Sequence, residues 1–255
     1  MNQRMQSTIL GAGERKDLHL PEKSLFKSEL IHDCQLKNAN LSSPIFEDCR
    51  FDHCVFEKCD FRGARFFYQT ALNNCLFKHA DLSGAGLSNS RFTDCTFVRC
   101  DFRQTSLKEC SFMNCTFENC KIIDNTFNAA DIRDCRFSGK LQETSFIAEQ
   151  PDTLLLIDFE RCILDCVIFK NCNLEQVVPP ADARHLYFPD LPQRASRALA
   201  WLSTQGDNPD NKILRRRLKN YELQRGGIFN LTSLTETEGK DVAGQLIELL
   251  TLPEH

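Results

Sequence analysis

Cysteine is the residue type in this chain with the widest range of available chemistry. The sequence holds 14 Cys and six His among 255 residues. Thiols can pair as disulfides, bind soft metals, or act as nucleophiles when a base lies beside them. Disulfide scaffolds are short secreted domains, and a metal site needs ligands that converge on one point. The spacing of the Cys residues decides among these chemistries.

Thirteen of the 14 Cys occupy one position of a five-residue repeat, and only Cys166 lies outside it. A large apolar residue recurs every five positions, and a small residue stands two positions before each one. The large residues run from Leu36 to Phe66, continue after one inserted residue from Leu72 to Phe137, and return at Phe159, Leu164, Phe169 and Leu174. Free Cys behaves as a small hydrophobe. Thiols that follow a packing register in this way are predicted to be structural and reduced.

A period of five matches neither the α-helix nor a simple strand. It fits a square coil in which each repeat forms one side, with the large and small residues pointing inward and polar turn residues at the corners. Stacked coils would pair their backbones at about 4.8 Å. Residues about 20 apart should then form columns. The predicted columns are Cys34, Cys54, Cys75, Cys95, Cys115 and Cys135, and Phe56, Phe77, Phe97, Phe117 and Phe137.

The segments CRFDHCVFEKCDFRGARF and HADLSGAGLSNSRFTDCTFVRCDF resemble the pentapeptide-repeat family, whose pattern is A(D/N)LxX with Cys and Phe as common substitutes. The resemblance covers roughly residues 26–175. It implies a mainly β fold, a right-handed quadrilateral parallel β-helix, followed here by a small α-helical segment. Some members imitate duplex DNA, bind DNA gyrase and protect it from quinolones or peptide toxins. In that group a C-terminal helical element mediates dimerisation.

The period divides the chain into three segments. Residues 1–25 lack it and are expected to extend from or cap the open end, 26–178 form the β-helix, and 179–255 form the helical segment. Helices are expected over Asp190–Gly206, from Asn208 to Gly226, and over Lys240–Leu252, because N-cap, proline and glycine signals bound apolar stripes there. Leu199, Trp201 and Leu202 are placed inside the first helix, and Ile213, Leu214, Leu218 and Tyr221 on one face of the second. The stripes must pack together, cap the coil, or join two copies as a homodimer.

Two interruptions and one basic run supply the candidate partner-binding residues. The insertion at residues 66–71 is expected to expose Phe67 and Tyr68, and the disturbed stretch at 147–158 contains Glu149 and Asp152. Loops on a rigid scaffold carry function more often than the scaffold does, although a tolerated insertion is the simpler alternative. The second helix adds Arg215 and Arg216, which fit an acidic partner or a solvated helix face.

Charge argues against direct nucleic-acid binding. Residues 31–178 carry 16 basic and 21 acidic side chains, whereas nucleic-acid binding needs a basic face. A DNA mimic needs an acidic stripe, but Asp52, Asp94 and Asp134 are interleaved with arginines. No apolar run reaches the length of a membrane span, and no secretory signal opens the chain. The cytoplasm is the expected compartment, with export as an effector left open.

No catalytic or cofactor motif is present in the sequence. The His residues have no Cys or carboxylate partner at a useful spacing, and no phosphate loop, nucleophile elbow or HExxH motif occurs. We therefore expect a non-enzymatic protein–protein interaction scaffold of bacterial type, without cofactor or metal. The alternatives are a DNA-mimicking protein that binds DNA gyrase or another topoisomerase, and a secreted effector adaptor.

Overall fold

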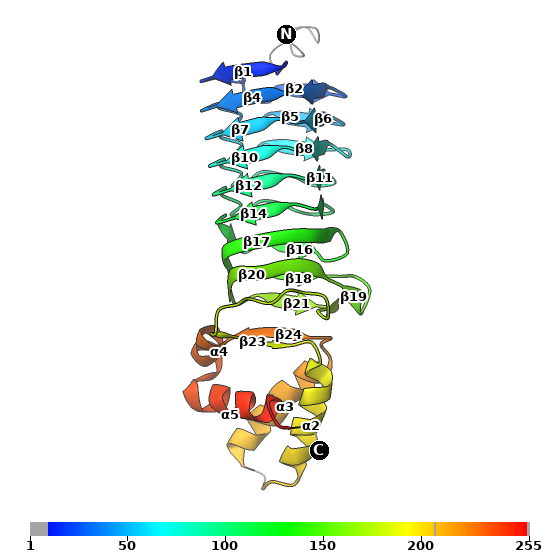
Figure 1. Ribbon diagram of the computed structural model, residues 1–255, viewed down its shortest axis with the longest axis vertical. Coiled ribbons are helices and arrows are strands. Elements are labelled where there is room, and N and C mark those ends of the chain that lie inside the picture. The colour runs from blue at the N-terminus through cyan, green and yellow to red at the C-terminus, as the bar shows by residue number, and fades with distance from the viewer. Residues whose placement is uncertain (1–9, 207, 254–255) are drawn as a thin grey trace.

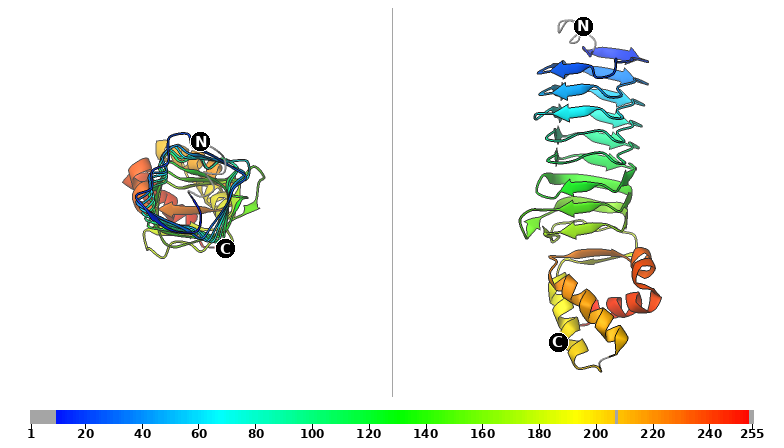
Figure 2. Two further views of the ribbon diagram at one scale, coloured as in Figure 1. Left: turned by 90° about the horizontal axis from the view of Figure 1, so that it is seen from above. Right: turned by 180° about the vertical axis from the view of Figure 1, so that it is seen from behind.

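The computed structural model describes residues 10–206 and 208–253 and consists of a straight rod with a helical tail at one end (Figure 1). The rod is a right-handed, four-sided parallel β-solenoid of about eight turns, and its square outline is visible along the axis (Figure 2). The predicted fold class is confirmed. Among the described residues, no helix combines the length and apolar character that crossing a membrane requires.

The four sides of the rod, numbered in the order in which the chain visits them, carry short strands joined by corners. Face 1 holds β1 (Gly13–Lys16), β4 (Cys34–Lys37), β7 (Val55–Glu57), β10 (Leu76–Lys78), β12 (Thr96–Val98) and β14 (Thr116–Glu118). Face 2 is joined mainly by single bridges such as Asp60 to Asp81, and then by β15 (Ile122–Ile123). Face 3 holds β2 (Leu25–Lys27), β5 (Ile45–Glu47), β8 (Arg65–Phe67), β16 (Thr126–Asn128), β18 (Ser145–Ile147) and β21 (Ile168–Lys170).

Face 4 holds β3 (Leu30–His32), β6 (Arg50–Asp52), β9 (Ala71–Asn73), β11 (Arg91–Thr93), β13 (Ser111–Met113), β19 (Thr153–Leu154) and β22 (Cys172–Asn173). Two longer strands turn corners and belong to more than one face, namely β17 (Ile132–Gln142) and β20 (Leu156–Asp165). Strand β17 pairs with β13, β14 and β15 in turn, so it runs from face 4 through face 1 to face 2.

Stacked aromatic rings fill the interior. Within the predicted column on face 1, ring centroids are 4.9 Å apart between Phe77 and Phe97, 5.0 Å between Phe97 and Phe117, and 4.5 Å between Phe117 and Phe137. These separations match the spacing of paired strands, because the backbone register sets the distance between rings. The predicted phenylalanine column is confirmed.

The small inward position holds a hydrogen-bond donor at most levels. Thirteen Cys are buried and Cys166 is exposed, as the register predicts. Most of the buried thiols reach toward the carbonyl oxygen of the large residue in the preceding coil; the Cys95 Sγ to Leu72 O distance is 3.3 Å. Thr105 makes the same contact through Oγ1, 2.8 Å from the oxygen of Leu82. The small position therefore adds a side-chain hydrogen bond between coils to its packing role.

The corners adopt a left-handed backbone conformation. In the described chain, 26 residues other than glycine have positive φ, seven of them Asp and six Asn, and most stand two positions after a large inward residue. Asp and Asn tolerate this region because their short side chains can bond locally. The insertion at residues 66–71 places two consecutive residues, Tyr68 and Gln69, in this conformation, so the next coil resumes one residue late.

The solenoid begins earlier than the predicted boundary at residue 26. Strand β1 pairs in register with β4, and the Lys23 amide donates to the carbonyl of Ser43. Backbone pairing needs no apolar residue, and Arg15 occupies the position where later coils carry a large apolar residue. Of the expected extension or cap at residues 1–25, residues 1–9 lie outside the described residues. At the other end, the last bond between coils joins the amide of Ala181 to the carbonyl of Glu160.

The register shifts at two points between residues 128 and 146, although Ile132 and Phe137 stay in register with the preceding coil. The five-residue period points Ala130 inward, but Ala129 is buried instead, because the Asn128 side chain accepts the Ala130 amide in a local turn. The coil from Ile122 to Leu141 contains 19 residues, and Phe146 fills the interior above Phe127. A one-residue deletion is absorbed at Gly139, whose φ is +91° and whose absent Cβ would lie 3.0 Å from the Asn119 backbone.

In its described residues, the tail contains four helices and a pair of antiparallel strands. These are β23 (His185–Phe188), α2 (Leu191–Ser203), α3 (Pro209–Glu222), β24 (Gly227–Asn230), α4 (Leu231–Glu238) and α5 (Lys240–Leu250). The three predicted helices are confirmed, and Asn208 caps α3 as expected. The two strands and α4 lack a clear apolar period and are missed by sequence analysis. Gly227 is required where it stands, because a Cβ there would lie 2.7 Å from the Phe229 ring.

In the tail, one residue predicted to be interior and one member of a predicted apolar face are exposed. Trp201 is 47% exposed and Ile213 is 45% exposed, because the helices bury Leu202 and Leu214 on narrower stripes than the sequence indicates. The buried stripes of α2, α3 and α5 pack into a second hydrophobic core that includes Leu191, Leu218 and Leu246. Packing together and capping the coil are therefore both realised.

Side chains of the tail complete the last coil. The Leu164 amide donates to His185 Nε2 at 3.0 Å, and the Leu164 carbonyl accepts from Asn230 Nδ2 at 2.9 Å. The Ser233 hydroxyl donates to Asp165 Oδ1 at 2.7 Å, and Ile228 joins the solenoid core. These groups occupy the place of another coil, so the exposed edge of the rod is covered.

Removing a ring from the column tests the packing argument. Phe97→Ala is expected to lower the free energy of unfolding by about 3–5 kcal/mol, because it opens a cavity between two stacked rings. Urea unfolding followed by circular dichroism measures the change. Tyr68→Ala is the matched control, since that ring is 69% exposed, and its effect should stay within about 0.5 kcal/mol. Equal midpoints for the two variants would contradict the column as a source of stability.

Candidate protein-binding surface

The insertion on face 3 presents one aromatic ring to solvent. Tyr68 is exposed and Phe67 is half-buried, with ring centroids 6.3 Å apart. Thr70 anchors the bulge from inside, because its buried hydroxyl donates to the Phe67 carbonyl at 2.8 Å. Gln69 accepts a hydrogen bond from Arg91 at 2.7 Å. The bulge is thus held from both sides, and Tyr68 projects from a fixed base.

The second interruption forms a turn between β18 and β19. Glu149 and Asp152 are both exposed in it, and Asp152 has a φ of 64°. Thr153 closes the turn by donating its hydroxyl to the Gln150 carbonyl at 2.8 Å. The two carboxylates therefore stand on an ordered projection of the rod.

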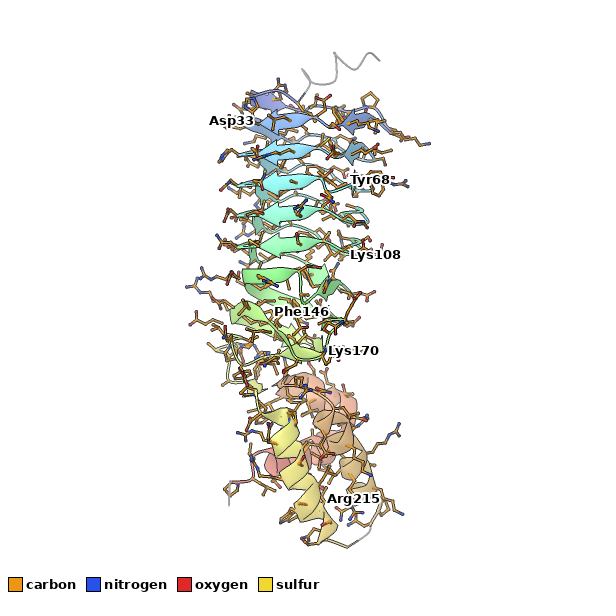
Figure 3. All side chains as sticks on the ribbon, turned by 90° about the vertical axis from the view of Figure 1, so that its right-hand side faces the viewer. Asp33, Tyr68, Lys108, Phe146, Lys170 and Arg215 are labelled. Carbon is orange, nitrogen blue, oxygen red and sulfur yellow. The ribbon has the colours of Figure 1, made fainter. Side chains whose placement is uncertain are left out.

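Four of the six candidate residues share one edge of the rod. Tyr68 follows β8, and the turn with Glu149 and Asp152 follows β18, so both lie at the corner where face 3 turns into face 4. We call this corner, with the outer side of face 3, the face-3 edge. Tyr68, Lys108 and Lys170 mark it along one side of the rod (Figure 3). The two projections lie four coils apart, roughly 19 Å at the usual strand spacing.

The two arginines lie elsewhere. Arg215 and Arg216 belong to α3 in the tail, away from the face-3 edge (Figure 3). Arg215 Nη2 donates to the Leu202 carbonyl at 2.9 Å and so joins α3 to α2. The side chain of Arg216 is exposed, and Arg217 pairs with Glu238 at 2.9 Å. Of the basic run, Arg216 is the member that faces solvent most openly.

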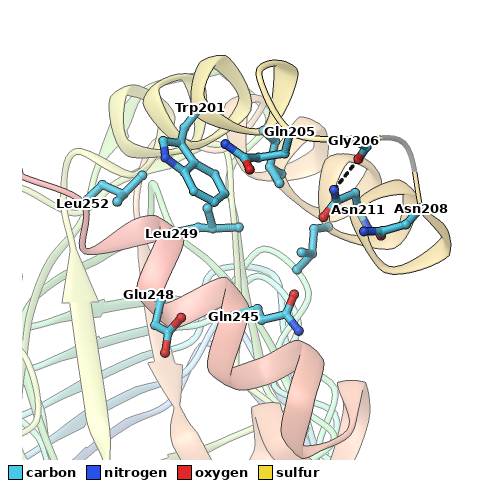
Figure 4. A pocket seen from close by; sticks show the side chains of 11 residues that line it. Trp201, Gln205, Gly206, Asn208, Asn211, Gln245, Glu248, Leu249 and Leu252 are labelled. Carbon is cyan, nitrogen blue, oxygen red and sulfur yellow. Dashed lines mark hydrogen bonds between the residues drawn. The ribbon is translucent and has the colours of Figure 1, made fainter.

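The tail also carries an open pocket of about 350 Å³ between α2, α3 and α5. Trp201, Leu249 and Leu252 form its apolar side, and Gln205, Gln245 and Glu248 its polar rim (Figure 4). Asn211 is held at the far side by a hydrogen bond to the Gly206 carbonyl (Figure 4). Trp201, which is 47% exposed, lines this pocket.

Acidic side chains on face 2 form a ladder that arginines neutralise. Asp60, Asp81 and Asp101 stand in register on successive coils. Arg62 binds Asp60 through two nitrogens and holds the pKa of that carboxyl below its usual range. Burial pushes the pKa of Asp101 upward, but hydrogen bonds from Arg103 outweigh it and the net shift is downward. The ladder is therefore a row of ion pairs rather than an acidic stripe.

Sequence analysis missed a notch in the face-3 edge. It has a volume of about 510 Å³ and lies between residues 105–109 of one coil and Asp124 and residues 126–128 of the next. Glu149 stands on its rim. The signal in the sequence is Asn125, which occupies a position that elsewhere holds a smaller side chain or threonine.

Burial raises the pKa of several solenoid thiols, whereas hydrogen bonds from the neighbouring thiol of Cys115 lower the pKa of Cys95 and Cys135. Burial raises the pKa of Cys110 to about 12 and that of Cys59 to about 11. The exposed Cys166 also has a raised pKa, because of partial burial and the neighbouring Asp165 carboxylate. Within residues 10–206 and 208–253, no three side chains of His, Cys, Asp or Glu gather as metal ligands. The arrangement supplies packing and hydrogen bonds rather than thiolate chemistry.

Comparison with known proteins agrees with the repeat. Two family models match the chain, "Pentapeptide repeat region" over residues 70–147 and "Pentapeptide repeats (9 copies)" over residues 26–85. Residues 26–147 are thus a pentapeptide-repeat region, and the columns, corners and stacked coils of the structure agree with that family. No curated protein matches the sequence.

Several solved structures resemble this one at low identity. The pentapeptide repeat protein Rfr23 of the cyanobacterium Cyanothece 51142 is 16% identical, with 40% of this chain and 82% of that chain covered and a TM-score of 0.37. QnrB1, a plasmid-mediated fluoroquinolone resistance protein, is 16% identical over 62% of this chain and 93% of that chain, with a TM-score of 0.32. HetL of Nostoc sp. strain PCC 7120, involved in heterocyst differentiation regulation, is 13% identical over 69% and 95%, with a TM-score of 0.32.

Thiol accessibility provides a direct test of the interior. A thiol-reactive dye is expected to label one site per native chain, Cys166, and all 14 thiols in denaturant, because the other 13 are buried. Mass spectrometry of the labelled peptides identifies the sites. Cys166→Ser should abolish labelling of the native chain. Rapid native labelling of Cys95 or Cys115 would contradict a closed interior.

Proposed function

We propose that this protein is a non-enzymatic scaffold of bacterial type that binds a protein partner. The proposal rests mainly on the burial of the reactive side chains: 13 of the 14 thiols are buried and hydrogen-bonded or packed between coils. The surface that remains is a rigid rod whose irregular features lie on the face-3 edge and in the tail. A rigid surface with a few ordered projections suits recognition, because little conformational entropy is lost on binding.

Charge and the state of the thiols refine the proposal. On the described part of the rod, outward ion pairs such as Arg62 with Asp60 and Lys37 with Glu57 balance the basic side chains, which disfavours the basic face that nucleic acid requires. Thirteen thiols that stay unpaired fit a reducing compartment, so we place the protein in the cytoplasm. An exported effector adaptor would use the same surfaces in another compartment.

The tail offers a place for a second copy. Trp201, Ile213 and Leu223 are exposed apolar side chains of the helical tail. We infer that a homodimer, if the protein forms one, joins through these helices, because the tail end of the rod carries apolar surface that the tail's own core leaves open.

DNA mimicry of a topoisomerase substrate is the alternative that the surface disfavours. A mimic of duplex DNA must place uncompensated negative charge along a groove-sized stripe. Arg62, Arg103 and Lys121 pair with the ladder of aspartates instead. We therefore expect the purified protein neither to inhibit supercoiling by DNA gyrase nor to protect gyrase from a quinolone. Inhibition that Asp60→Asn together with Asp101→Asn relieves would reverse this expectation.

Quantitative capture tests the scaffold. The immobilised full chain is expected to bind a host protein saturably, and Tyr68→Ala with Glu149→Lys should weaken that binding about tenfold if the face-3 edge is used. Arg216→Glu tests the tail, and Glu118→Lys on face 1 is the control for charge. Point variants are used to test the tail in place of its deletion, because deletion would expose the backbone of the last coil and would disturb the rod itself. Absence of any saturable partner would remove the proposal, and sedimentation of the same preparation reports the homodimer.

A further inference from the structure

The backbone ladder of the solenoid is interrupted at one level of face 3. In the two coils below this level, the Ser106 amide donates to the Ala85 carbonyl, and the Leu87 amide donates to the Ser106 carbonyl. The equivalent bonds one coil further along the chain, between residues 105–109 and 126–128, are absent among the described residues. Strand β16 pairs upward with β18, and no bridge joins it to Ser106.

The interruption is local. On face 2 the adjacent pair Asp101 and Lys121 remains bridged, and on face 4 Phe112 remains in register with Ile132. The interior also stays closed, because Leu107 and Phe127 on either side of the gap are buried. The result is a notch in the outer wall with a sealed floor, rather than a break in the rod.

Asn125 holds the two coils apart. Its side chain is 2% exposed, and Nδ2 donates to the Phe102 carbonyl at 2.9 Å and toward the Thr105 carbonyl at 3.4 Å. The Thr105 carbonyl is the acceptor that the Thr126 amide would otherwise use. Oδ1 of Asn125 is buried and has no hydrogen-bond partner in the described chain. A buried polar atom without a partner costs about 1–3 kcal/mol, so the rod carries a local energetic cost at this level.

The lips of the notch present unpaired backbone. The amides of Leu107 and Thr126 have no backbone partner among the described residues, and both residues line a gap of about 510 Å³. An array of unpaired amides and carbonyls on a sheet is complementary to another extended chain. Small ligands with isolated charges would leave most of these groups unsatisfied, so the chemistry favours a polypeptide backbone.

The rim selects the charge of that polypeptide. Asp124 and Glu149 are exposed on the C-terminal side of the notch. On its N-terminal side, the Glu109 carboxylate is 3.8 Å from the Lys108 ammonium, a weak ion pair. Three carboxylates against one ammonium give the rim a net negative charge. An extended segment with Lys or Arg side chains would therefore match it better than an acidic one.

We propose that the notch between residues 105–109 and 126–128 is a docking site for an extended, basic segment of the partner protein. The segment pairs its backbone with the lips, and its basic side chains contact Asp124 and Glu149. The inference rests on the proposed scaffold function and assigns it a binding mode, strand addition at the face-3 edge.

The test uses the full chain and three synthetic peptides of equal length. The first alternates Lys with Val and Thr, the second replaces each Lys with Glu, and the third repeats the first with alternate backbone nitrogens methylated. Fluorescence anisotropy measures binding of each labelled peptide. The basic peptide is expected to bind at least about tenfold more tightly than the other two, because the second carries the opposite charge and the third lacks half of the amide donors.

Variants of the protein locate the site. Asp124→Lys with Glu149→Lys should weaken binding of the basic peptide about tenfold, and Glu118→Lys on face 1 is the control that should not. Asn125→Cys restores a thiol like Cys100, which reaches the Phe77 carbonyl, and should close the notch without unfolding the rod. Hydrogen exchange gives an independent measure, since the amides of Leu107 and Thr126 should slow when the basic peptide binds.

The outcomes separate the notch from the scaffold. Equal binding of all three peptides, or no binding of any, would overturn the docking site and leave the notch as a solvated irregularity. In one outcome, the full chain captures a host protein that the Asp124→Lys, Glu149→Lys double variant still binds equally well. That result would keep the proposed scaffold function and would reject strand addition at the notch. Loss of both peptide and host protein in that variant supports the two proposals together.

Discussion

Every other feature of this molecule depends on the pair of side chains that each repeat turns inward. Coils paired through their backbones stack at one fixed distance, so the side chains of one face form a column with the same spacing. Flat rings such as Phe97 and Phe117 fill that spacing without leaving voids. The small residue must leave room for the ring, and Cys and Thr also donate a hydrogen bond to the coil below. The thiols, which suggest reactive sites in the sequence, are therefore structural residues of the solenoid core.

The same constraint explains what sequence analysis could and could not predict. The period located the rings, the buried thiols and the corners, because inward positions are dictated by residue size. It missed the first coil, where pairing of β1 with β4 is carried by backbone and Arg15 replaces the large apolar residue. It missed β23, β24 and α4, which have no clear apolar period. It placed Trp201 inside, because an aromatic on an amphipathic helix gives no sign of how wide the buried stripe is.

The candidate site shows the same division. The breaks in the period pointed correctly to Tyr68 and Glu149 as exposed positions, but only the fold shows that they share one edge of the rod. The notch between them leaves almost no trace in the sequence, since Asn125 keeps the register and Phe127 remains inward. The notch is open because a set of backbone hydrogen bonds is missing, and backbone hydrogen bonds can form between residues of almost any type. The regular faces of a solenoid can be predicted because the inward residue types repeat, whereas an interruption of the backbone hydrogen bonds changes no residue type and is difficult to predict.

The tail closes the rod with side chains that imitate a strand, and this has a consequence for how such a molecule can change in length. His185 and Asn230 bind the amide and carbonyl of Leu164, which is a backbone feature that any coil presents on that face. A gene that duplicated or lost one internal coil of about 20 residues would offer the same pair of groups to the same two side chains. Evolution could then lengthen or shorten the rod, and shift the distance between its projections, without redesigning either end.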